Sequence, residues 1–234
     1  MASPPIVELV GPAGVGKTTL TQALSRRSRA VLPVPPPYYR RIRQVPFFVR
    51  NTFLSLPSFV ELAGHRRLGW PSRREMAWMV ILEGWPGALR QQSSQGEAIL
   101  LLDQGPVFLL AVLDAFGPGV LASREAQGWW SRMYRQWAAA LDIVFLLDAP
   151  DEVCAKRIRG REQWHIVKYA PDETLFEFQA RFRQAYERVI ARLTSAGAGP
   201  RVFCLNTAEH SPDEIVDRIL VACDFDDGRG ETEY

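Results

Sequence analysis

The stretch that decides the fold is Ile6-Val7-Glu8-Leu9-Val10 followed by Gly11-Pro12-Ala13-Gly14-Val15-Gly16-Lys17-Thr18. Its first part is a short apolar run, which is typical of a buried strand. Its second part matches the pattern Gly-x-x-x-x-Gly-Lys-Ser/Thr, in which glycines let backbone N–H groups turn inward around phosphate oxygens. A helical segment follows at 20–29 and presents its positive end to the same charge. The order of strand, loop and helix predicts a nucleotide-binding phosphate loop.

Each loop residue has an expected task in binding ATP and Mg²⁺. Lys17 reaches the β- and γ-phosphates, and the Thr18 hydroxyl ligates the metal ion. The remaining expected nucleotide-binding residues of the loop are Gly11, Gly14, Val15, Gly16 and Thr19.

Further strands are expected at 30–34, 98–103, 141–147 and 201–205, because each segment is a short apolar run. Strands that alternate with helices predict an open parallel sheet, whose ligands bind beyond the carboxyl ends of the strands. Residues 38–72 are rich in Pro, Arg and aromatic residues and are expected to be irregular. A helix over 73–92 is expected to break or kink near Gly84 and Pro86. Pro-Asp-Glu at 150–152, 171–173 and 212–214 predicts three helix starts, the last with Ser211 as N-cap.

Composition narrows the class of protein. The chain has 234 residues, 47% of them hydrophobic and 23% charged, with a net charge of +2, which is typical of a globular protein. No apolar run reaches the roughly 18 residues that a membrane span needs. Cys154, Cys204 and Cys223 lack paired spacing and are expected to be buried thiols in a reducing cytosol. The sequence therefore predicts a cytoplasmic protein.

Arginine is concentrated near the start of the chain. Residues 21–74 contain 11 arginines and one acid, Glu61. Such a region would attract an anionic small-molecule acceptor, although a solvated basic surface explains it equally well. The overall charge is too balanced for a dedicated nucleic-acid binder. Trp129, Trp130 and Trp137 are expected in the core or on a partner-facing stripe.

Other positions separate the classes of phosphate-loop protein. A GTPase carries Asn-Lys-x-Asp, and neither late lysine, Lys156 or Lys168, follows an asparagine. A motor ATPase uses a Glu after the aspartate of the third strand, whereas Gln104 follows Asp103 here. A kinase needs a magnesium partner and positive charge at the transferred phosphoryl group. Asp103 would supply the first. Arg157 and Arg161, four residues apart on one expected helical face, would supply the second.

Four stretches resemble the thymidylate kinase and deoxynucleoside kinase group: GPAGVGKTTL at 11–20, ILLLDQGP at 99–106, DIVFLLDAPDEVCAKRIRGRE at 142–162 and RVFCLNTAEHSPDEIVDRIL at 201–220. The resemblance implies a P-loop NTPase fold of the α/β class, with a five-stranded parallel sheet in the order 2-3-1-4-5. It implies one domain over 1–223, with an acceptor-side insertion at about 35–95 and an arginine-bearing lid at about 157–171. It places Asn206 beside the adenine. Residues 224–234 are expected to form a flexible acidic tail.

The chain departs from this family at two places that concern the acceptor. Gln104 stands where the family has an arginine that holds the acceptor, and no acid follows the second strand, where deoxynucleoside kinases carry their general base. A hydroxyl acceptor would then need Asp103, or second Glu83, as base, whereas a phosphate acceptor needs none. The expected acceptor-binding residues are Tyr38, Arg73, Arg74, Glu83 and Gln104.

The sequence thus predicts an ATP- and Mg²⁺-dependent kinase of a nucleoside monophosphate or nucleoside. Two alternatives stay open: a kinase of a non-nucleotide alcohol, such as a sugar or secondary metabolite, and a nucleotide-dependent binding or regulatory protein without turnover. A homodimer is also left open.

Overall fold

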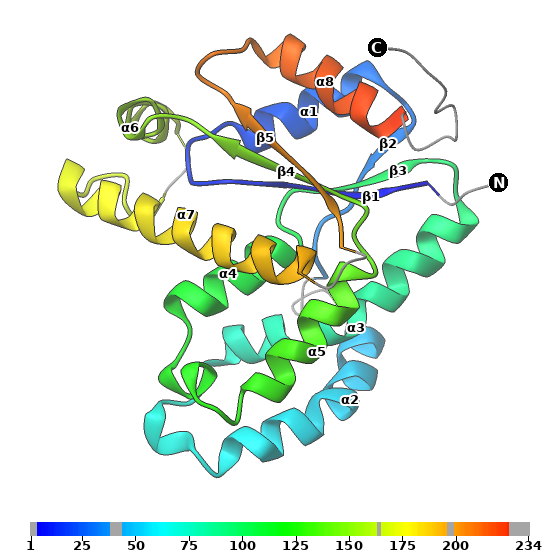
Figure 1. The fold of residues 1–234 in the computed structure, drawn as a ribbon, viewed down its shortest axis with the longest axis vertical. Coiled ribbons are helices and arrows are strands. Elements are labelled where there is room, and N and C mark those ends of the chain that lie inside the picture. Colours follow the sequence, from blue (N-terminus) through cyan, green and yellow to red (C-terminus); the bar gives the residue numbers. More distant parts are fainter. Residues whose placement is uncertain (1–3, 38–43, 163–164, 196–198, 225–234) are drawn as a thin grey trace.

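The computed structural model describes residues 4–37, 44–162, 165–195 and 199–224. Its five strands are β1 (Ile6–Val10), β2 (Val31–Pro33), β3 (Ile99–Leu102), β4 (Ile143–Asp148) and β5 (Arg201–Asn206). They form one parallel sheet, as the apolar runs predicted, in the order β2-β3-β1-β4-β5 that the family resemblance implied (Figure 1). Strand β1 lies between β3 and β4, where the strand order changes direction. The carboxyl ends of these three strands therefore surround a common site.

Helices cover both faces of the sheet. Helices α1 (Lys17–Arg27) and α8 (Pro212–Asp224) lie on one face (Figure 1). The other face carries α2 (Val45–Ala63), α3 (Arg73–Gln95), α4 (Pro106–Phe116), α5 (Gln127–Ala138) and α7 (Asp172–Thr194). Helix α6 (Asp151–Gly160) follows β4, and short 3₁₀ turns occur at Arg66–Leu68 and Gly119–Ala122.

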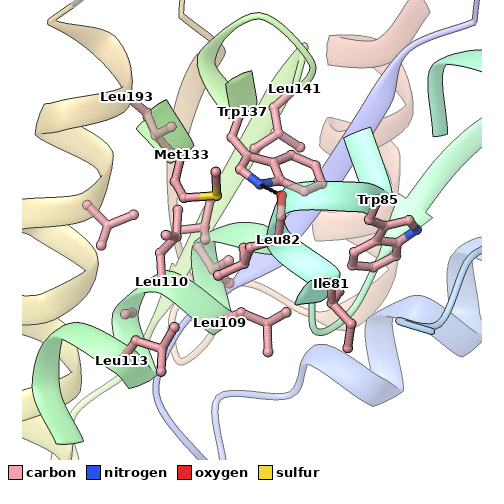
Figure 2. Close-up of a cluster of buried hydrophobic side chains, with 14 of the residues drawn as sticks. Ile81, Leu82, Trp85, Leu109, Leu110, Leu113, Met133, Trp137, Leu141 and Leu193 are labelled. Carbon is pink, nitrogen blue, oxygen red and sulfur yellow. Dashed lines mark hydrogen bonds between the residues drawn. The ribbon is translucent and has the colours of Figure 1, made fainter. Parts of the chain in front are cut away.

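The alternation of side chains along β1 divides the core into two layers. Ile6 and Val10 pack against the layer of α3, α4, α5 and α7, whereas Val7 and Leu9 pack against α1 and α8. Figure 2 shows the larger layer, where the indole N–H of Trp137 donates to the carbonyl oxygen of Leu82 over 3.0 Å. Trp129 is buried with Trp137, which confirms their assignment to the core.

Helix α2 occupies part of the segment that was expected to be irregular. Its buried positions are Asn51, Ser55, Ser58 and Leu62, and Phe47, Phe48 and Phe59 are partly buried against the core. Polar residues therefore interrupt the apolar stripe that would predict a core-facing helix. Helix α3 likewise continues through Gly84 and Pro86, where a break was expected. Gly84, Trp85 and Pro86 are buried there, and we attribute the continuity to this packing, which offsets the local cost of proline.

The three expected helix starts are confirmed at α6, α7 and α8. Ser211 caps α8, because its hydroxyl accepts the backbone N–H of Glu214 over 3.3 Å. Cys154 and Cys223 are buried as expected, but Cys204, in the edge strand β5, is exposed. None of the described helices is both long and apolar enough to cross a membrane. The expected tail lies outside the described residues from 225 onward.

The arginines of residues 21–74 that the structure describes lie on both faces of the sheet. Arg27 ends α1 and pairs with Asp217 of α8 over 3.3 Å. Arg73 and Arg74 open α3, on the opposite face of the sheet (Figure 1). Arg40, Arg41 and Arg43 lie outside the described residues. The attraction of an anionic acceptor to this region stays a prediction.

Candidate active site

The P-loop runs from the end of β1 to the start of α1 and lies against α6. Gly11, Gly14 and Gly16 all have positive φ, at 147°, 83° and 103°. A Cβ atom on Gly14 would lie 2.5 Å from the carbonyl oxygen of Cys154 in α6. Only glycine combines this backbone conformation with so close an approach to α6. The glycine at position 14 therefore determines how the loop packs against this helix.

Lys17 is the first residue of α1, and its ammonium group folds back onto the loop. Nζ donates to the carbonyl oxygens of Gly11 over 2.7 Å and Pro12 over 3.0 Å. Burial lowers the pKa of Lys17 to about 8, while the nearby charge of Asp103 opposes the shift and that of Arg161 adds to it. The lysine is thus held at the loop, where a phosphate would restore its full charge.

Thr18 and Asp103 meet across two elements. The Thr18 hydroxyl donates to Oδ2 of Asp103 over 3.2 Å, joining the first turn of α1 to the end of β3. Burial raises the pKa of Asp103, and the charge of Lys17 and the Thr18 hydrogen bond counteract that rise. A hydroxyl and a carboxylate are the hard oxygen ligands that Mg²⁺ takes, usually with several waters. These two residues therefore fit the expected metal site.

Arg157 joins the P-loop to the loop after β5. Its guanidinium donates to the side-chain and backbone oxygens of Thr207, both over 2.9 Å, and to the carbonyl oxygen of Val15 over 3.5 Å. On the same loop, Oδ1 of Asn206 accepts the backbone N–H of Ala208 over 2.9 Å. Arg157 thus contacts the side of the site that the resemblance assigns to the base, rather than extending freely over the loop.

Arg157 and Arg161 line one cavity together with Val153, Lys156 and Gly160, on the side of α6 that their spacing of four predicted, and Arg161 is the C-cap of this helix, at φ −85° and ψ 150°. The positive charge of Arg161 still acts on Lys17 and on His165. Its backbone oxygen accepts a hydrogen bond from Lys168. This arginine thus stays within electrostatic reach of the P-loop, as a phosphate contact requires.

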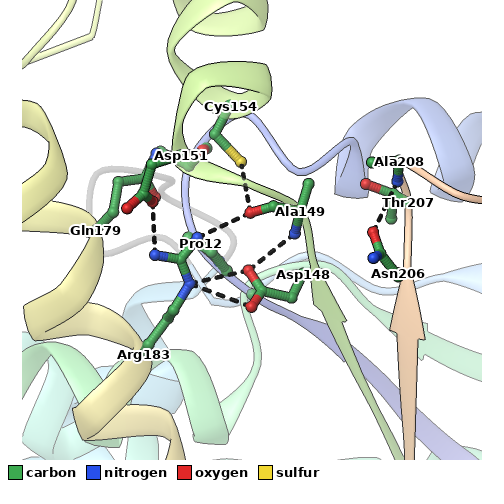
Figure 3. A network of polar contacts seen from close by, with 12 residues as sticks. Pro12, Asp148, Ala149, Asp151, Cys154, Gln179, Arg183, Asn206, Thr207 and Ala208 are labelled. Carbon is green, nitrogen blue, oxygen red and sulfur yellow. Dashed lines mark hydrogen bonds and ion pairs between the residues drawn. The ribbon is translucent and has the colours of Figure 1, made fainter. Parts of the chain in front are cut away.

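Helix α7 supplies two residues that the sequence analysis missed (Figure 3). Arg183 donates to Asp148 over 2.9 Å, to Asp151 over 2.6 Å and to the carbonyl oxygen of Ala149 over 2.9 Å. Gln179, one turn earlier and fully buried, donates to the carbonyl oxygen of Ala13 over 3.0 Å. Together they hold the P-loop and the turn between β4 and α6. Their spacing of four residues on an expected helix was the available signal.

Glu8 is a third residue that the sequence analysis missed. It lies in β1 and is fully buried, and its carboxylate accepts the backbone N–H groups of Val107 over 2.9 Å and Phe108 over 3.0 Å. These are the first free donors of α4. Burial raises the pKa of Glu8 to about 8, although these N–H groups oppose the shift. Glu8 thus joins the strand before the P-loop to the helix after Asp103. The available signal in the sequence was an acidic residue within the otherwise apolar run at 6–10.

The expected acceptor residues are not gathered by any contact the structure describes. Gln104 is exposed at the end of β3, while Arg73 and Arg74 are exposed on the first turn of α3, with Arg74 over the ring of Trp78 at 4.5 Å. Glu83 accepts from Ser58 over 2.9 Å and pairs with Arg132 over 3.5 Å, between α2, α3 and α5. Tyr38 lies outside the described residues. The acceptor roles stay predictions.

Two solved structures share the fold along nearly the whole chain. Deoxyadenosine kinase from M. mycoides, solved with bound dATP, matches with a TM-score of 0.54 and 13% identity over 94% of this chain and 99% of its own. Thymidylate kinase from Candida albicans matches with a TM-score of 0.56 and 14% identity over 97% and 94%. Neither a protein-family model nor a curated protein sequence matches the chain. At such low identity, the likeness establishes the fold alone.

Proposed function

We propose that the protein transfers the γ-phosphoryl group of ATP to a nucleoside or a nucleoside monophosphate. The observation that carries the proposal is the convergence of Lys17, Thr18 and Asp103 at the carboxyl ends of β1 and β3. A phosphate-binding lysine and a pair of hard oxygen ligands are the parts that phosphoryl transfer requires. The nucleoside class is supported by the fold shared with a deoxyadenosine kinase and a thymidylate kinase.

The described residues would divide the work as follows. The P-loop backbone and Lys17 would bind the β- and γ-phosphates, and Arg157 would fix the loop beside the base. Thr18 and Asp103 would hold Mg²⁺, Asp103 through a bound water; the ion would neutralise phosphate charge. Arg161 would stabilise the negative charge that spreads over the transferred group. The bond that breaks joins the γ-phosphorus to the bridging oxygen of ADP, and the acceptor oxygen forms the new one.

The identity of the general base depends on the acceptor. A phosphate acceptor is ionised at neutral pH and needs none. For a hydroxyl acceptor we favour Asp103, because Glu83 is already bound by Ser58 and Arg132. The raised pKa of Asp103 would suit proton transfer.

A second candidate function is phosphorylation of a non-nucleotide alcohol. Gln104 favours it, because an uncharged residue follows Asp103 at the end of β3, where a phosphate acceptor would gain from a cation. Gln104 could instead donate and accept hydrogen bonds with hydroxyl groups.

ADP release with a panel of acceptors tests these alternatives. The protein is incubated with ATP, Mg²⁺ and nucleosides, nucleoside monophosphates, sugars or other alcohols. Release that requires a nucleoside or its monophosphate, and that Lys17→Ala abolishes without changing the circular dichroism spectrum, supports the proposal. Release that requires only a sugar or another alcohol supports the second candidate. Release without any acceptor indicates an ATPase, and ATP binding without release indicates a binding protein. Either of the last two results would overturn the kinase assignment.

A further inference from the structure

Residues 165–170, between α6 and α7, form a turn that is packed beside the P-loop. Val167, near the middle of this turn, is buried in a small apolar cluster that it shares with α6 and α7. Ala13 of the P-loop packs against the same cluster. The turn lies at the end of the sheet that carries the P-loop (Figure 1). It therefore has a fixed position next to the loop that would bind phosphate.

His165 begins this turn, and two contacts fix its imidazole ring. The ring meets Phe178 of α7 edge to face, with the centroids 5.8 Å apart and the planes at 80°. Its Nδ1 accepts the backbone N–H of Val167 over 3.4 Å. Because an accepting ring nitrogen carries no proton, the neutral ring has its proton on Nε2. Nε2 has no partner in the hydrogen bonds that the structure describes, so it is available to donate to a ligand.

Two cations share the surroundings of this ring. The positive charges of Lys17 and Arg161 both act on His165. The Nε atom of Arg161 is buried and has no hydrogen-bond partner among the described residues. A buried donor without a partner is costly, so it indicates a ligand that accepts from it. A phosphate bound by Lys17 is such a ligand, because its oxygens accept hydrogen bonds and its charge offsets that of both cations.

We propose that His165 is a catalytic residue that donates a hydrogen bond from Nε2 to an oxygen of the γ-phosphoryl group of ATP. This inference rests on the proposed function and adds a residue to the same site. Lys17 and Arg161 would supply positive charge to this group, and the imidazole would supply a directed hydrogen bond. Such a bond strengthens as negative charge collects on the phosphoryl oxygens during transfer. The ring itself transfers no proton.

The charge state of the ring does not decide the contact. Burial lowers the pKa of His165, and the charges of Arg161 and Lys17 lower it further, so the ring is neutral in the free protein near pH 7. Lys168 adds a cation to the same turn, where it binds the backbone oxygen of Arg161, and the side chain that α7 turns to the ring, Phe178, does not titrate. The neutral ring and the imidazolium both carry a hydrogen on Nε2, so either form can donate.

Binding of β,γ-methylene-ATP and of ADP, each with Mg²⁺, tests the contact without turnover. His165→Asn keeps an acceptor near the position of Nδ1 but lacks the Nε2 donor, whereas His165→Gln places an amide N–H close to the position of Nε2. We expect His165→Asn to weaken the ATP analogue about tenfold in calorimetric titrations and to leave ADP, which has no γ-phosphate, unchanged. His165→Gln should bind both nucleotides within about threefold of the wild type.

Steady-state kinetics test the catalytic part of the proposal. With the member of the acceptor panel that releases most ADP, His165→Asn should lower kcat about 100-fold, more than it raises the KM for ATP. His165→Gln should recover most of this loss. His65→Asn is the matched control, because His65 lies beyond the end of α2 and pairs with Glu125 over 3.6 Å. It should leave both nucleotide binding and turnover unchanged.

The outcomes distinguish this proposal from the proposed function. Unchanged affinity of His165→Asn for the ATP analogue, or equal weakening of the analogue and ADP, would overturn the γ-phosphate contact. A loss of kcat that His165→Gln does not recover, together with a lower melting temperature, would show that the ring only packs against Phe178 and would also overturn it. If the wild type releases no ADP with any acceptor, the proposed function fails, and the binding comparison alone then decides whether His165 contacts the γ-phosphate. A wild type that does not bind ATP would overturn both.

Discussion

The Thr18 hydroxyl donates a hydrogen bond to Oδ2 of Asp103 over 3.2 Å, although the two residues are 85 positions apart in the chain. One residue belongs to the P-loop helix, and the other directly follows the neighbouring strand β3. Parallel pairing of β1 and β3 brings them together, because both carboxyl ends lie at the same edge of the sheet. We therefore treat them as one unit of the proposed metal site.

Asp103→Asn should lower kcat by about 100-fold or more, because the amide removes the negative charge that would hold Mg²⁺ and any proton-accepting role. The amide retains one acceptor oxygen for Thr18, so the protein should fold normally. Steady-state kinetics at several Mg²⁺ concentrations measure the effect, and excess Mg²⁺ should recover part of the activity if metal binding is the main loss. A change confined to the KM for ATP would instead make Asp103 a binding residue.

The affinity for ATP should fall as the pH rises above about 8. The pKa of Lys17 in the free protein is lowered to about 8 by burial. Only the protonated amine attracts phosphate, so each further pH unit costs up to about tenfold in affinity until the pKa of the complex is reached. Calorimetric titration of ATP across pH values below and above 8 measures the loss. Lys17→Arg, which stays charged throughout, is the control and should lack it; identical pH profiles for the two proteins would refute the assignment.

The strands and the P-loop could be predicted from local sequence signals, and the strand order from the family resemblance, whereas α2 could not be predicted. The apolar runs of β1 and β3 and the pattern ending in Lys17 and Thr18 are local signals, each carried by adjacent residues. Helix α2 gives a misleading signal, because its inner face is polar and its partners, including Glu83 and Arg132, come from α3 and α5. Such contacts arise from tertiary packing, so no single segment of the sequence predicts them.

The residues of the candidate site also divide into those that the sequence could predict and those that it could not. Lys17, Thr18 and Asp103 follow from motif and strand-end position. Glu8 and Arg183 act on backbone groups far away in the chain, in the first turn of α4 and the turn after β4. Backbone groups carry no sequence signature, so these two side chains could be noticed only as charges at unusual positions.

Glu8 should make the protein less stable as the pH rises. Burial raises its pKa from an ordinary value near 4.5 to about 8. A group whose pKa is raised on folding stabilises fully below its unfolded pKa and loses this contribution as the pH rises through its folded pKa. The melting temperature should therefore fall between about pH 5 and 8, by about 2–4 °C for each kcal/mol lost.

Glu8→Gln is the control for this pH dependence. Its side chain does not titrate, so the difference in melting temperature between wild type and variant should shrink steadily from pH 5 toward pH 8. Other titrating groups affect both proteins alike and cancel in the difference. Parallel profiles would show that Glu8 keeps one protonation state, held charged by the N–H groups of Val107 and Phe108.

Arg183→Met should weaken both the fold and nucleotide binding. The side chain binds Asp148, Asp151 and the carbonyl oxygen of Ala149, and Gln179 on the same helix holds the P-loop. Loss of these charge-assisted hydrogen bonds should cost about 1–3 kcal/mol in the free energy of unfolding. Because the turn after β4 then shifts against the P-loop, the dissociation constant for ATP should rise severalfold.

Arg188→Met separates this role from an ordinary surface ion pair. Arg188 lies on the same helix and pairs with Asp114 over 2.6 Å, but it is more exposed than Arg183 and does not contact the P-loop or the turn after β4 in the hydrogen bonds that the structure describes. Its loss should cost no more than about 1 kcal/mol and leave ATP binding unchanged. Urea unfolding and calorimetry compare the two variants. Equal effects on ATP affinity would mean that α7 supports the site only through general stability, whereas an effect confined to Arg183→Met would establish it as a positioning residue for the P-loop.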